Sequence, residues 1–397
     1  MKMIIKNGNV ITQERIIYGS GIVIEDNKIA KIFGGDELLE QDDCIVVDAE
    51  GNYISPGFID IHTHGGGGHD FMDGTKDSII EAAKAHMNYG TTSIIPTTMT
   101  STKESLFNTF DNIKEIKNSY YEGPNILGLH LEGPYFSEEQ KGAQDSKYIK
   151  DPDPNEYLEI LNYSNDIVRW TIAPERKGAI ELGRELISRG IKCAIGHSNA
   201  VYEQVLEAYE NGYSLITHFY SGMSMVRRIN MFRYPGVVES GYLIDDMYVE
   251  VIADGMHLPA SLLKLIYKIK GPDRICLVTD SMRGAGMPEG EYVLGNMETG
   301  QKVVVEDGVA KLLTRDAFAG SVATADRLVR NMIKLADVPL HEAVKMMTFN
   351  PAKVMGIEKT KGSITIGKDA DIVIFNNNID IKAVIVGGKI LINNLEK

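Results

Sequence analysis

The sequence predicts an α/β protein, a TIM-like (β/α)8 barrel with a small β-sandwich domain formed from both chain termini. Two observations support this fold class. The middle of the chain alternates short apolar strands with amphipathic helices, whereas both ends contain only short strands between turn residues. We therefore assign residues 56–355 to the barrel, and residues 1–55 together with 356–397 to the β-sandwich domain.

The two chain ends share one style of sequence. The N-terminal segment contains three runs with alternating or β-branched residues between Asn-Gly, Asp-Asn and Gly turns, at residues 3–11, 19–35 and 44–54. Residues 362–392 repeat this pattern. Because both ends have the same pattern, we expect them to form one domain, with the barrel inserted between them.

The middle segment consists of repeated strand–helix units. Compact apolar runs are predicted as barrel strands at residues 91–98, 125–133, 191–198, 213–219, 249–255 and 274–280. Stretches such as 78–90, 201–213 and 258–269 have the apolar spacing of amphipathic helices, with glycines near their ends. Repeated units of this total length indicate a (β/α)8 barrel, which takes roughly 250 residues or more.

Composition limits the classes of partner. The net charge of -14 and the pI near 5.2 oppose binding to nucleic acid or to anionic membranes, so an anionic substrate needs a local basic pocket. We expect no signal peptide and no membrane span, because no run of about 18 apolar residues occurs. Cys44, Cys193 and Cys276 are scattered and lack a Cys-x-x-Cys spacing, which predicts a reducing, cytoplasmic location.

Polar residues that can bind metals follow the predicted strands. The strand-end residues of this kind are His62, His64, Glu132, His197, His218, His257 and Asp280. In a (β/α)8 barrel the carboxyl ends of the strands form the mouth, so these residues are expected to converge there.

A metal site is the preferred interpretation of five of these residues, namely His62, His64, Glu132, His197 and His218. His62 and His64 are two residues apart, so both side chains face one side of a strand, although His-x-His alone is a weak pattern. Glu132 follows a buried strand, where a buried salt bridge is the alternative to metal binding. With His197 and His218, one strand–helix unit apart, it forms a two-histidine, one-carboxylate set that leaves a coordination position open.

Other polar residues suit proton transfer and anion binding. Asp280 is placed to exchange protons beside a metal site, with a helix N-cap as the alternative. His257 either binds a substrate carbonyl or caps the next helix. A loop carries Arg227, Arg228 and Arg233, whose guanidinium groups suit phosphate oxygens, although a run of charge is usually a solvated surface.

A series of motifs extends in order over nearly the whole chain: PGFIDIHTHG, GLHLEGPY, KGA, IGHSNA, THFYSGMS, RYPGVVE, ADGMHLP, VTDSMRGAGMPEG, FAGSVATADRLVRNM and FNPAKVMGI. Together they resemble the N-acetylglucosamine-6-phosphate deacetylases of the amidohydrolase superfamily. The resemblance implies a homodimeric enzyme that hydrolyses N-acetyl-D-glucosamine 6-phosphate to D-glucosamine 6-phosphate and acetate. It also implies one or two divalent ions per subunit, with Zn²⁺ preferred over Fe²⁺ or another divalent ion.

The same resemblance assigns the metal ligands. It implies that Glu132, His197 and His218 hold the principal ion and that His62 and His64 supply a second site. Some members lack the His-x-His pair and work with one ion, so the pair permits a binuclear centre without requiring it.

The resemblance also assigns groups that act on the substrate. Asp280 matches the catalytic aspartate, which takes a proton from metal-activated water and returns it to the leaving amine. His257 matches a histidine that contacts the substrate near its carbonyl. Arg233 matches an arginine that binds the phosphate, either in its own subunit or in a neighbouring one.

Three residues of the predicted substrate site depart from the family pattern. Ser221 and Gly222 replace an Asn-Ala pair that contacts the phosphate, and Gln144 stands where a sugar-contacting histidine is common. These changes keep open a deacetylase of another amino-sugar phosphate, such as N-acetylgalactosamine 6-phosphate. A cyclic-amide hydrolase or deaminase is disfavoured by Glu132 in LHLEGP, and a catalytically inactive sugar-phosphate-binding scaffold is disfavoured by the complete set of candidate ligands.

Overall fold

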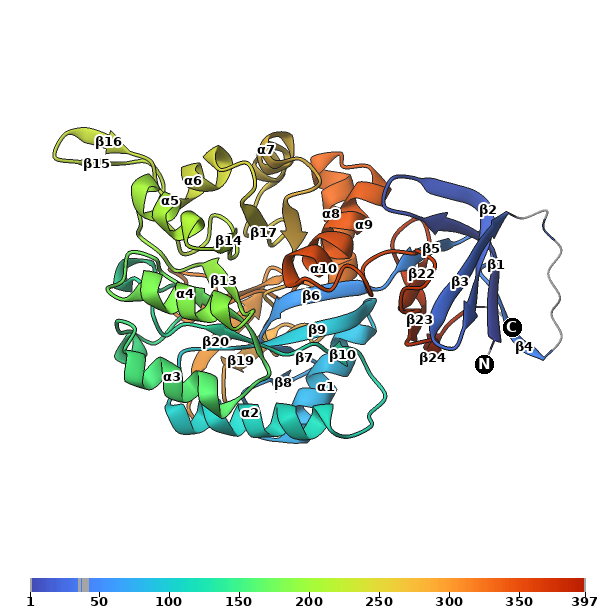
Figure 1. Cartoon of the computed structure of the whole chain (residues 1–397), viewed down its shortest axis with the longest axis horizontal. Helices are drawn as coiled ribbons and strands as arrows, with labels where there is room; N and C mark the ends of the chain where they lie inside the picture. Colours follow the sequence, from blue (N-terminus) through green and yellow to red (C-terminus); the bar gives the residue numbers. More distant parts are fainter. Residues whose placement is uncertain (1, 35–36, 38–42, 396–397) are drawn as a thin grey trace.

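The computed structural model describes residues 2–34, 37 and 43–395, so Gly35, the last residue of the second predicted strand segment, lies outside it. The described chain forms a barrel surrounded by helices and a separate sheet beside it (Figure 1). The sheet contains strands from both chain ends. The predicted fold class is confirmed.

The barrel is a nearly closed ring of parallel strands. Neighbouring strands pair in the order β10-β9-β11-β12-β13-β14-β17-β18, with β6 paired to the other side of β9. Their bounds are β6 Phe58–Thr63, β9 Thr91–Thr98, β10 Asn125–Ile126, β11 Leu129–Glu132, β12 Ile167–Ile172, β13 Lys192–Ile195, β14 Tyr213–Ile216, β17 Tyr248–Val251 and β18 Ile275–Leu277. The backbone N–H of Asp280 donates to the carbonyl of His62 at 2.8 Å and thereby links the two end strands of the ring.

Burial on both faces explains why the sequences of these strands are continuous runs of mostly apolar residues. Every residue of β6 and β9 is buried, since one face packs inside the barrel and the other lies under the helices. Ile59, Ile95 and Leu215 are among the side chains of the inner cluster. The barrel interior is therefore a packed core that supports the mouth above it.

Ten α-helices of the described residues alternate with or follow these strands: α1 Lys76–Met87, α2 Lys103–Lys117, α3 Pro154–Tyr163, α4 Ala179–Ser188, α5 Tyr202–Glu210, α6 Val237–Leu243, α7 Ala260–Lys270, α8 Ala325–Ala336, α9 Leu340–Met347 and α10 Phe349–Met355. The predicted helices 78–90, 201–213 and 258–269 correspond to α1, α5 and α7. Helix α1 begins where the Thr75 side chain accepts a hydrogen bond from the Ser78 N–H.

Strands from the two chain ends form a separate mixed sheet. Its order is β24-β23-β22-β5-β1-β2-β3, with β4 paired to β1. The strand bounds are β1 Lys2–Ile11, β2 Ile16–Glu25, β3 Lys28–Gly34, β4 Cys44–Asp48, β5 Tyr53–Pro56, β22 Ile372–Phe375, β23 Ile381–Val386 and β24 Lys389–Asn393. Antiparallel pairing of Ile54 with Ile374 joins the two ends, and both contribute to one buried cluster. The residue boundaries proposed for the two domains stay a prediction.

Three small sheets lie outside these two bodies. Strands β7 (Gly65–Gly66) and β8 (His69–Asp70) pair after β6, and β19 (Gly290–Leu294), β20 (Gln301–Glu306) and β21 (Val309–Leu312) form a three-stranded sheet. The hairpin of β15 (Arg227–Ile229) and β16 (Phe232–Tyr234) projects from the barrel at the end far from the terminal sheet (Figure 1).

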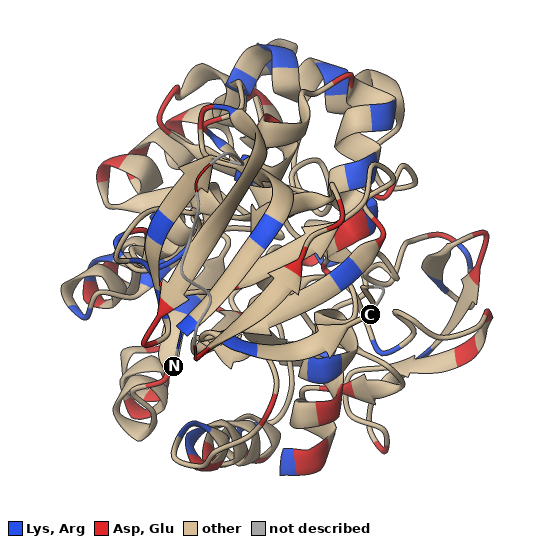
Figure 2. Cartoon of the chain, turned by 90° about the vertical axis from the view of Figure 1, so that its right-hand side faces the viewer, with Lys and Arg blue, Asp and Glu red and all other residues tan. Residues whose placement is uncertain are grey.

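Two surface properties of the described chain bear on partners. None of its helices is both long and apolar enough to cross a membrane. In the view onto the terminal sheet, Lys and Arg segments of its strands are intermixed with Asp and Glu segments (Figure 2).

Candidate active site

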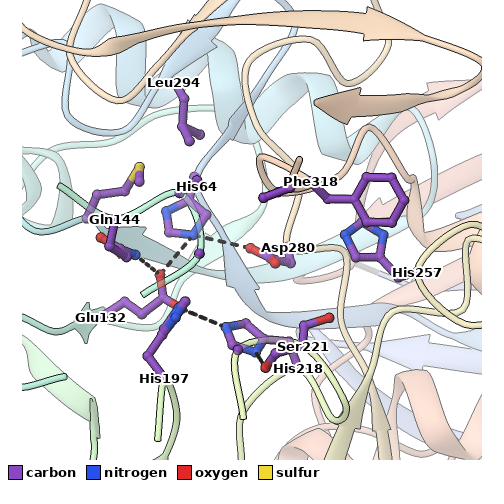
Figure 3. Close-up of a pocket in the computed structure, with 16 residues that line it drawn as sticks. His64, Glu132, Gln144, His197, His218, Ser221, His257, Asp280, Leu294 and Phe318 are labelled. Atoms are coloured by element: carbon purple, nitrogen blue, oxygen red, sulfur yellow. Dashed lines mark hydrogen bonds and ion pairs between the residues drawn. The ribbon is translucent and has the colours of Figure 1, made fainter. Parts of the chain in front are cut away.

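The strand-end side chains meet at the barrel mouth, as Figure 3 shows for those that line the pocket. His62 belongs to β6 and Glu132 to β11, whereas His197, His218 and Asp280 follow the ends of β13, β14 and β18. All five are buried. Residues remote in the sequence are therefore neighbours in space.

Three of these residues have strained backbone conformations. His197, His218 and Asp280 have φ angles of 46°, 29° and 46°, in the left-handed region that residues other than glycine rarely adopt. Such a conformation costs about 1–3 kcal/mol and persists only where the surroundings enforce it. The three turns occur directly after barrel strands, where they set the directions of the candidate ligands.

Glu132 is the centre of the cluster. Its Oε1 lies 3.1 Å from His218 Nε2, 3.3 Å from His197 Nε2 and 3.5 Å from His62 Nε2. Its Oε2 lies 3.3 Å from His64 Nε2. Two groups that could hold an ion result, His62–His64–Glu132 and Glu132–His197–His218, each with its ligand atoms within 4.8 Å of one another.

The hydrogen bonds of the histidines make the second group a suitable cation site. His197 Nδ1 lies 2.8 Å from the carbonyl of Gln140, and His218 Nδ1 lies 3.1 Å from the carbonyl of Ser221. Since carbonyls only accept, both Nδ1 atoms carry protons, so Nε2 is the atom of each ring that can present a lone pair to an ion. These two Nε2 atoms lie 3.2 Å apart beside the Glu132 carboxylate, a donor set that fits a divalent ion.

His62 is held by a charged pair beneath the mouth. Its Nδ1 lies 3.1 Å from Glu250 Oε2, and Glu250 forms an ion pair with the fully buried Arg169. Among the described residues the His62 Nε2 atom has no hydrogen-bond partner, although it is buried and faces Glu132 and Asp280. An unpartnered buried nitrogen in this position fits a metal ligand.

The pKa values in the cluster reflect strong mutual interactions. Burial disfavours the charge of Glu132, but His62 and the three other imidazoles outweigh it and hold its pKa well below the usual range. Burial likewise disfavours charging of His64 and His218. Contacts with Asp280 and Glu132 raise the His64 pKa well above its usual value, and Glu132 raises that of His218 to about 9.

Asp280 faces the same centre from the other side. Its Oδ1 lies 3.2 Å from His64 Nε2 and 3.5 Å from His62 Nε2. Burial disfavours its charge, but these two histidines lower its pKa to about 2, so the carboxylate is ionised. No helix follows Asp280, so the alternative interpretation as a helix N-cap is wrong.

A cavity of about 240 Å³ opens above the centre. Four of the residues predicted to bind substrate line it, namely Gln144, Ser221, Gly222 and His257. His257 Nδ1 lies 2.8 Å from Asp254 Oδ2, which leaves Nε2 for a ligand, and its ring packs against Phe318 at 4.7 Å between centroids. Pro259, not His257, is the N-cap of α7.

Comparison with known proteins assigns this architecture to a family. The Amidohydrolase family model matches residues 53–391. The chain belongs to the amidohydrolase family. It is 34% identical to an N-acetylglucosamine-6-phosphate deacetylase of Lysinibacillus sphaericus over 98% of both chains. It is 29% identical to an N-acetylgalactosamine-6-phosphate deacetylase of Escherichia coli O157:H7, covering 98% of this chain and 99% of that one.

A solved structure agrees over the whole length. The N-acetylglucosamine-6-phosphate deacetylase from Pasteurella multocida superposes with a TM-score of 0.91 at 30% identity, covering 99% of this amidohydrolase and all of that chain. Family membership and the two histidine–glutamate groups agree with a divalent metal centre at the barrel mouth.

One predicted binding residue of this amidohydrolase lies elsewhere. Arg233 is exposed on β16, opposite Arg228 in the hairpin, and does not line the cavity. Arg227 donates to Asn199 instead of facing the pocket. A single subunit of this amidohydrolase therefore does not bring Arg233 to the metal centre.

Sequence reasoning missed the residues that support the ligands. Glu250 and Arg169 each interrupt an apolar barrel strand. Since a buried charge needs a partner of opposite sign, an acidic residue in one strand and a basic residue in another could have identified the pair from the sequence. Asp254 orients His257 and belongs to the motif ADGMHLP, and Phe318 packs on His257 and belongs to the motif FAGSVATADRLVRNM. No role was predicted from the sequence for either residue.

Proposed function

We propose that this amidohydrolase removes the acetyl group from N-acetyl-D-glucosamine 6-phosphate, giving D-glucosamine 6-phosphate and acetate. The observation that carries the proposal is the meeting of Glu132, His197 and His218 opposite the ionised Asp280. The deacetylases of L. sphaericus and P. multocida, which it matches over nearly its whole length, support the same reaction. We infer that the ion is Zn²⁺, with Fe²⁺ or another divalent ion as the alternative.

Asp280 is the proposed proton carrier. Glu132, His197 and His218 would hold a divalent ion, which would supply positive charge to polarise an amide carbonyl and to make nearby water more acidic. The Asp280 carboxylate accepts the proton of the attacking water and then delivers it to the nitrogen of the departing amine.

His257 orients the acetyl end of the substrate in this proposal. Asp254 fixes its ring through Nδ1, and Phe318 packs on one side, so its Nε2 is held at the cavity wall. A nitrogen fixed in this way binds the substrate near its carbonyl with little loss of side-chain entropy. Ser221 and Gly222 also line the cavity, and we place the sugar phosphate beside them.

We further propose a homodimer in which Arg233 reaches the phosphate of a neighbouring subunit. The hairpin extends away from its own barrel (Figure 1), and none of its arginines lines its own cavity. A guanidinium group suits a phosphate, and the acidic chain has few other cations near the cavity. The buried thiols of Cys193 and Cys276 support a reducing, cytoplasmic location.

The test is acetate release by the purified protein from two sugar phosphates. We expect a higher kcat/KM with N-acetylglucosamine 6-phosphate than with N-acetylgalactosamine 6-phosphate, loss of activity after chelation, and recovery with Zn²⁺. A preference for the galactosamine compound would instead support the alternative represented by the E. coli relative. Absence of acetate release from both compounds by the metal-loaded protein would favour the inactive scaffold.

A further inference from the structure

We propose that Gln144 is a positioning residue that holds Glu132 in the orientation needed to share its carboxylate between two ions. This inference rests on the proposed function, in that it requires the cluster to bind divalent metal. Gln144 lies in the loop after the short 3₁₀ helix Glu138–Gln140 and is 5% exposed. Its Nε2 donates to Glu132 Oε2 at 2.8 Å (Figure 3).

The orientation of the Gln144 amide is fixed by its other neighbour. Gln144 Oε1 accepts hydrogen bonds from Thr100 N at 3.0 Å and from Thr100 Oγ1 at 2.9 Å. A backbone N–H can only donate, so the amide oxygen must face Thr100 and the amide nitrogen must face Glu132. The flipped amide would place two donors together at Thr100 and two acceptors together at Glu132.

The oxygen that Gln144 binds is the one on the His64 side. Glu132 Oε2 lies 3.3 Å from His64 Nε2, whereas Oε1 lies nearest His218 and His197. Oε1 also lies 3.5 Å from His62 Nε2, so Oε1 lies between the two candidate ion positions and Oε2 faces the His64 side alone. Because Gln144 occupies one acceptor site of Oε2 and leaves the other, it prevents the carboxylate from turning both oxygens toward the His197–His218 side.

This arrangement predicts a specific role in metal stoichiometry. A single ion at His197 and His218 can be bound by either oxygen of a rotating carboxylate. For the carboxylate to give one oxygen to each ion, Oε2 has to remain on the His64 side. Gln144 therefore contributes more to the second ion than to the first, and Thr100, two residues after the end of β9, provides the fixed point from which it acts.

The test compares Gln144→Met with wild type and with Thr100→Val. Methionine has nearly the length of glutamine but cannot donate, whereas Thr100→Val removes one hydroxyl and keeps the backbone bond to Gln144. Metal-free proteins are titrated with Zn²⁺ against a chromophoric chelator, bound metal is counted by elemental analysis, and thermal unfolding verifies folding. In Gln144→Met we expect the second ion to bind about 10- to 100-fold more weakly, the range found when a partner of a metal ligand is removed.

The control outcomes separate this inference from the proposed function. Wild type and Thr100→Val should bind two ions, with the first ion bound equally well in all three proteins. The role of Gln144 would be overturned if Gln144→Met bound both ions without loss, if both ions were weakened equally, or if wild type bound one ion. Binding of no ion by wild type, together with no acetate release, would overturn the proposed function itself.

A second variant covers the case in which Gln144→Met does not fold. Gln144→Asn keeps the amide but is one methylene shorter, so it cannot contact Thr100 and Glu132 at once. It should show the same selective weakening of the second ion. Two ions bound with wild-type affinity by this variant would contradict the inference.

Discussion

Asp280 combines two properties that a proton carrier requires. It is ionised, because His62 and His64 lower its pKa to about 2 against the effect of burial, and it faces the centre formed by Glu132. Its left-handed backbone, with φ of 46°, places the carboxylate there directly after β18. We therefore assign proton transfer to Asp280 and metal binding mainly to its neighbours.

The variant Asp280→Asn tests this division. Asparagine keeps the shape of the side chain but cannot accept and return a proton, so kcat should fall by about 10²- to 10⁴-fold. The principal ion should remain, since Glu132, His197 and His218 are unchanged. Acetate release and metal content are measured on the same preparation, and near-normal turnover would remove Asp280 from this role.

His86 predicts a stability change at mildly acidic pH. It is 2% exposed on α1, and its Nε2 lies 2.9 Å from the carbonyl of Gly65. Burial, partly offset by that carbonyl, lowers its pKa from 6.5 to about 4. The unfolded chain therefore binds more protons between pH 6.5 and 4. The stability contribution is complete above pH 6.5 and is lost as the pH falls toward 4, by about 3 kcal/mol in all.

The matched variant is His86→Gln, whose amide can still donate to Gly65 but does not titrate. Carboxylates that titrate in the same range do so in both proteins, so the difference between the proteins reports on His86. Urea unfolding of the metal-free proteins at pH 7 and pH 4.5 should show a smaller loss of stability for the variant. Equal losses would contradict the assignment.

At the scale of elements, the loop after β14 brings the backbone of Gly222 close to the side chain of His197. Gly222 has φ of +56°, and a Cβ there would lie 2.8 Å from His197 Nδ1 and 3.0 Å from the carbonyl of Gln140. That carbonyl is the hydrogen-bond partner of the same Nδ1 atom. A side chain at position 222 would therefore push directly on the group that orients the ligand.

Gly222→Ala and Gly142→Ala form a matched pair. Both glycines have φ of +56° and both adjoin His197, but a Cβ at Gly142 would lie at an ordinary 3.6 Å from the ring. Both variants should lose about 1–2 kcal/mol from the left-handed backbone. Only Gly222→Ala should also weaken binding of the principal ion, as measured by Zn²⁺ titration. Equal metal affinity in the two variants would contradict the clash.

The pattern of elements explains which parts of the site the sequence predicts. Strand ends converge in any (β/α)8 barrel, so Glu132, His197 and His218 were predictable as neighbours once the repeating units were recognised. No comparable rule predicts from the sequence which side chains contact each other across the barrel. The pairing of Arg169 with Glu250, and the contact of Gln144 with Glu132, depend on side-chain directions that periodicity does not specify.

At the scale of the whole molecule, the chain presents two ends with different surfaces. The terminal sheet joins both chain ends through β5 and β22, and its outward face has intermixed charges. The hairpin at the other end carries exposed apolar side chains, including Met231 at 88% and Phe232 at 68% exposure. Exposed apolar side chains next to Arg233 favour a protein interface at this end of the molecule.

The double variant Met231→Asp/Phe232→Asp tests whether this hairpin joins two subunits. Two buried carboxylates would oppose the interface, so sedimentation velocity should change from dimer to monomer. The monomer should keep its metal, but KM should rise about tenfold or more, because a hydrogen bond to a charged group contributes about 1.5–3 kcal/mol and Arg233 would no longer reach the neighbouring phosphate.

Tyr18→Asp is the matched control for this experiment. Tyr18 is 69% exposed on β2, in the sheet far from the hairpin, so the same kind of substitution there should leave both mass and KM unchanged. A hairpin variant that remains dimeric would place the interface elsewhere. A monomeric variant with unchanged KM would separate the hairpin from the phosphate and leave Arg233 without a role in substrate binding.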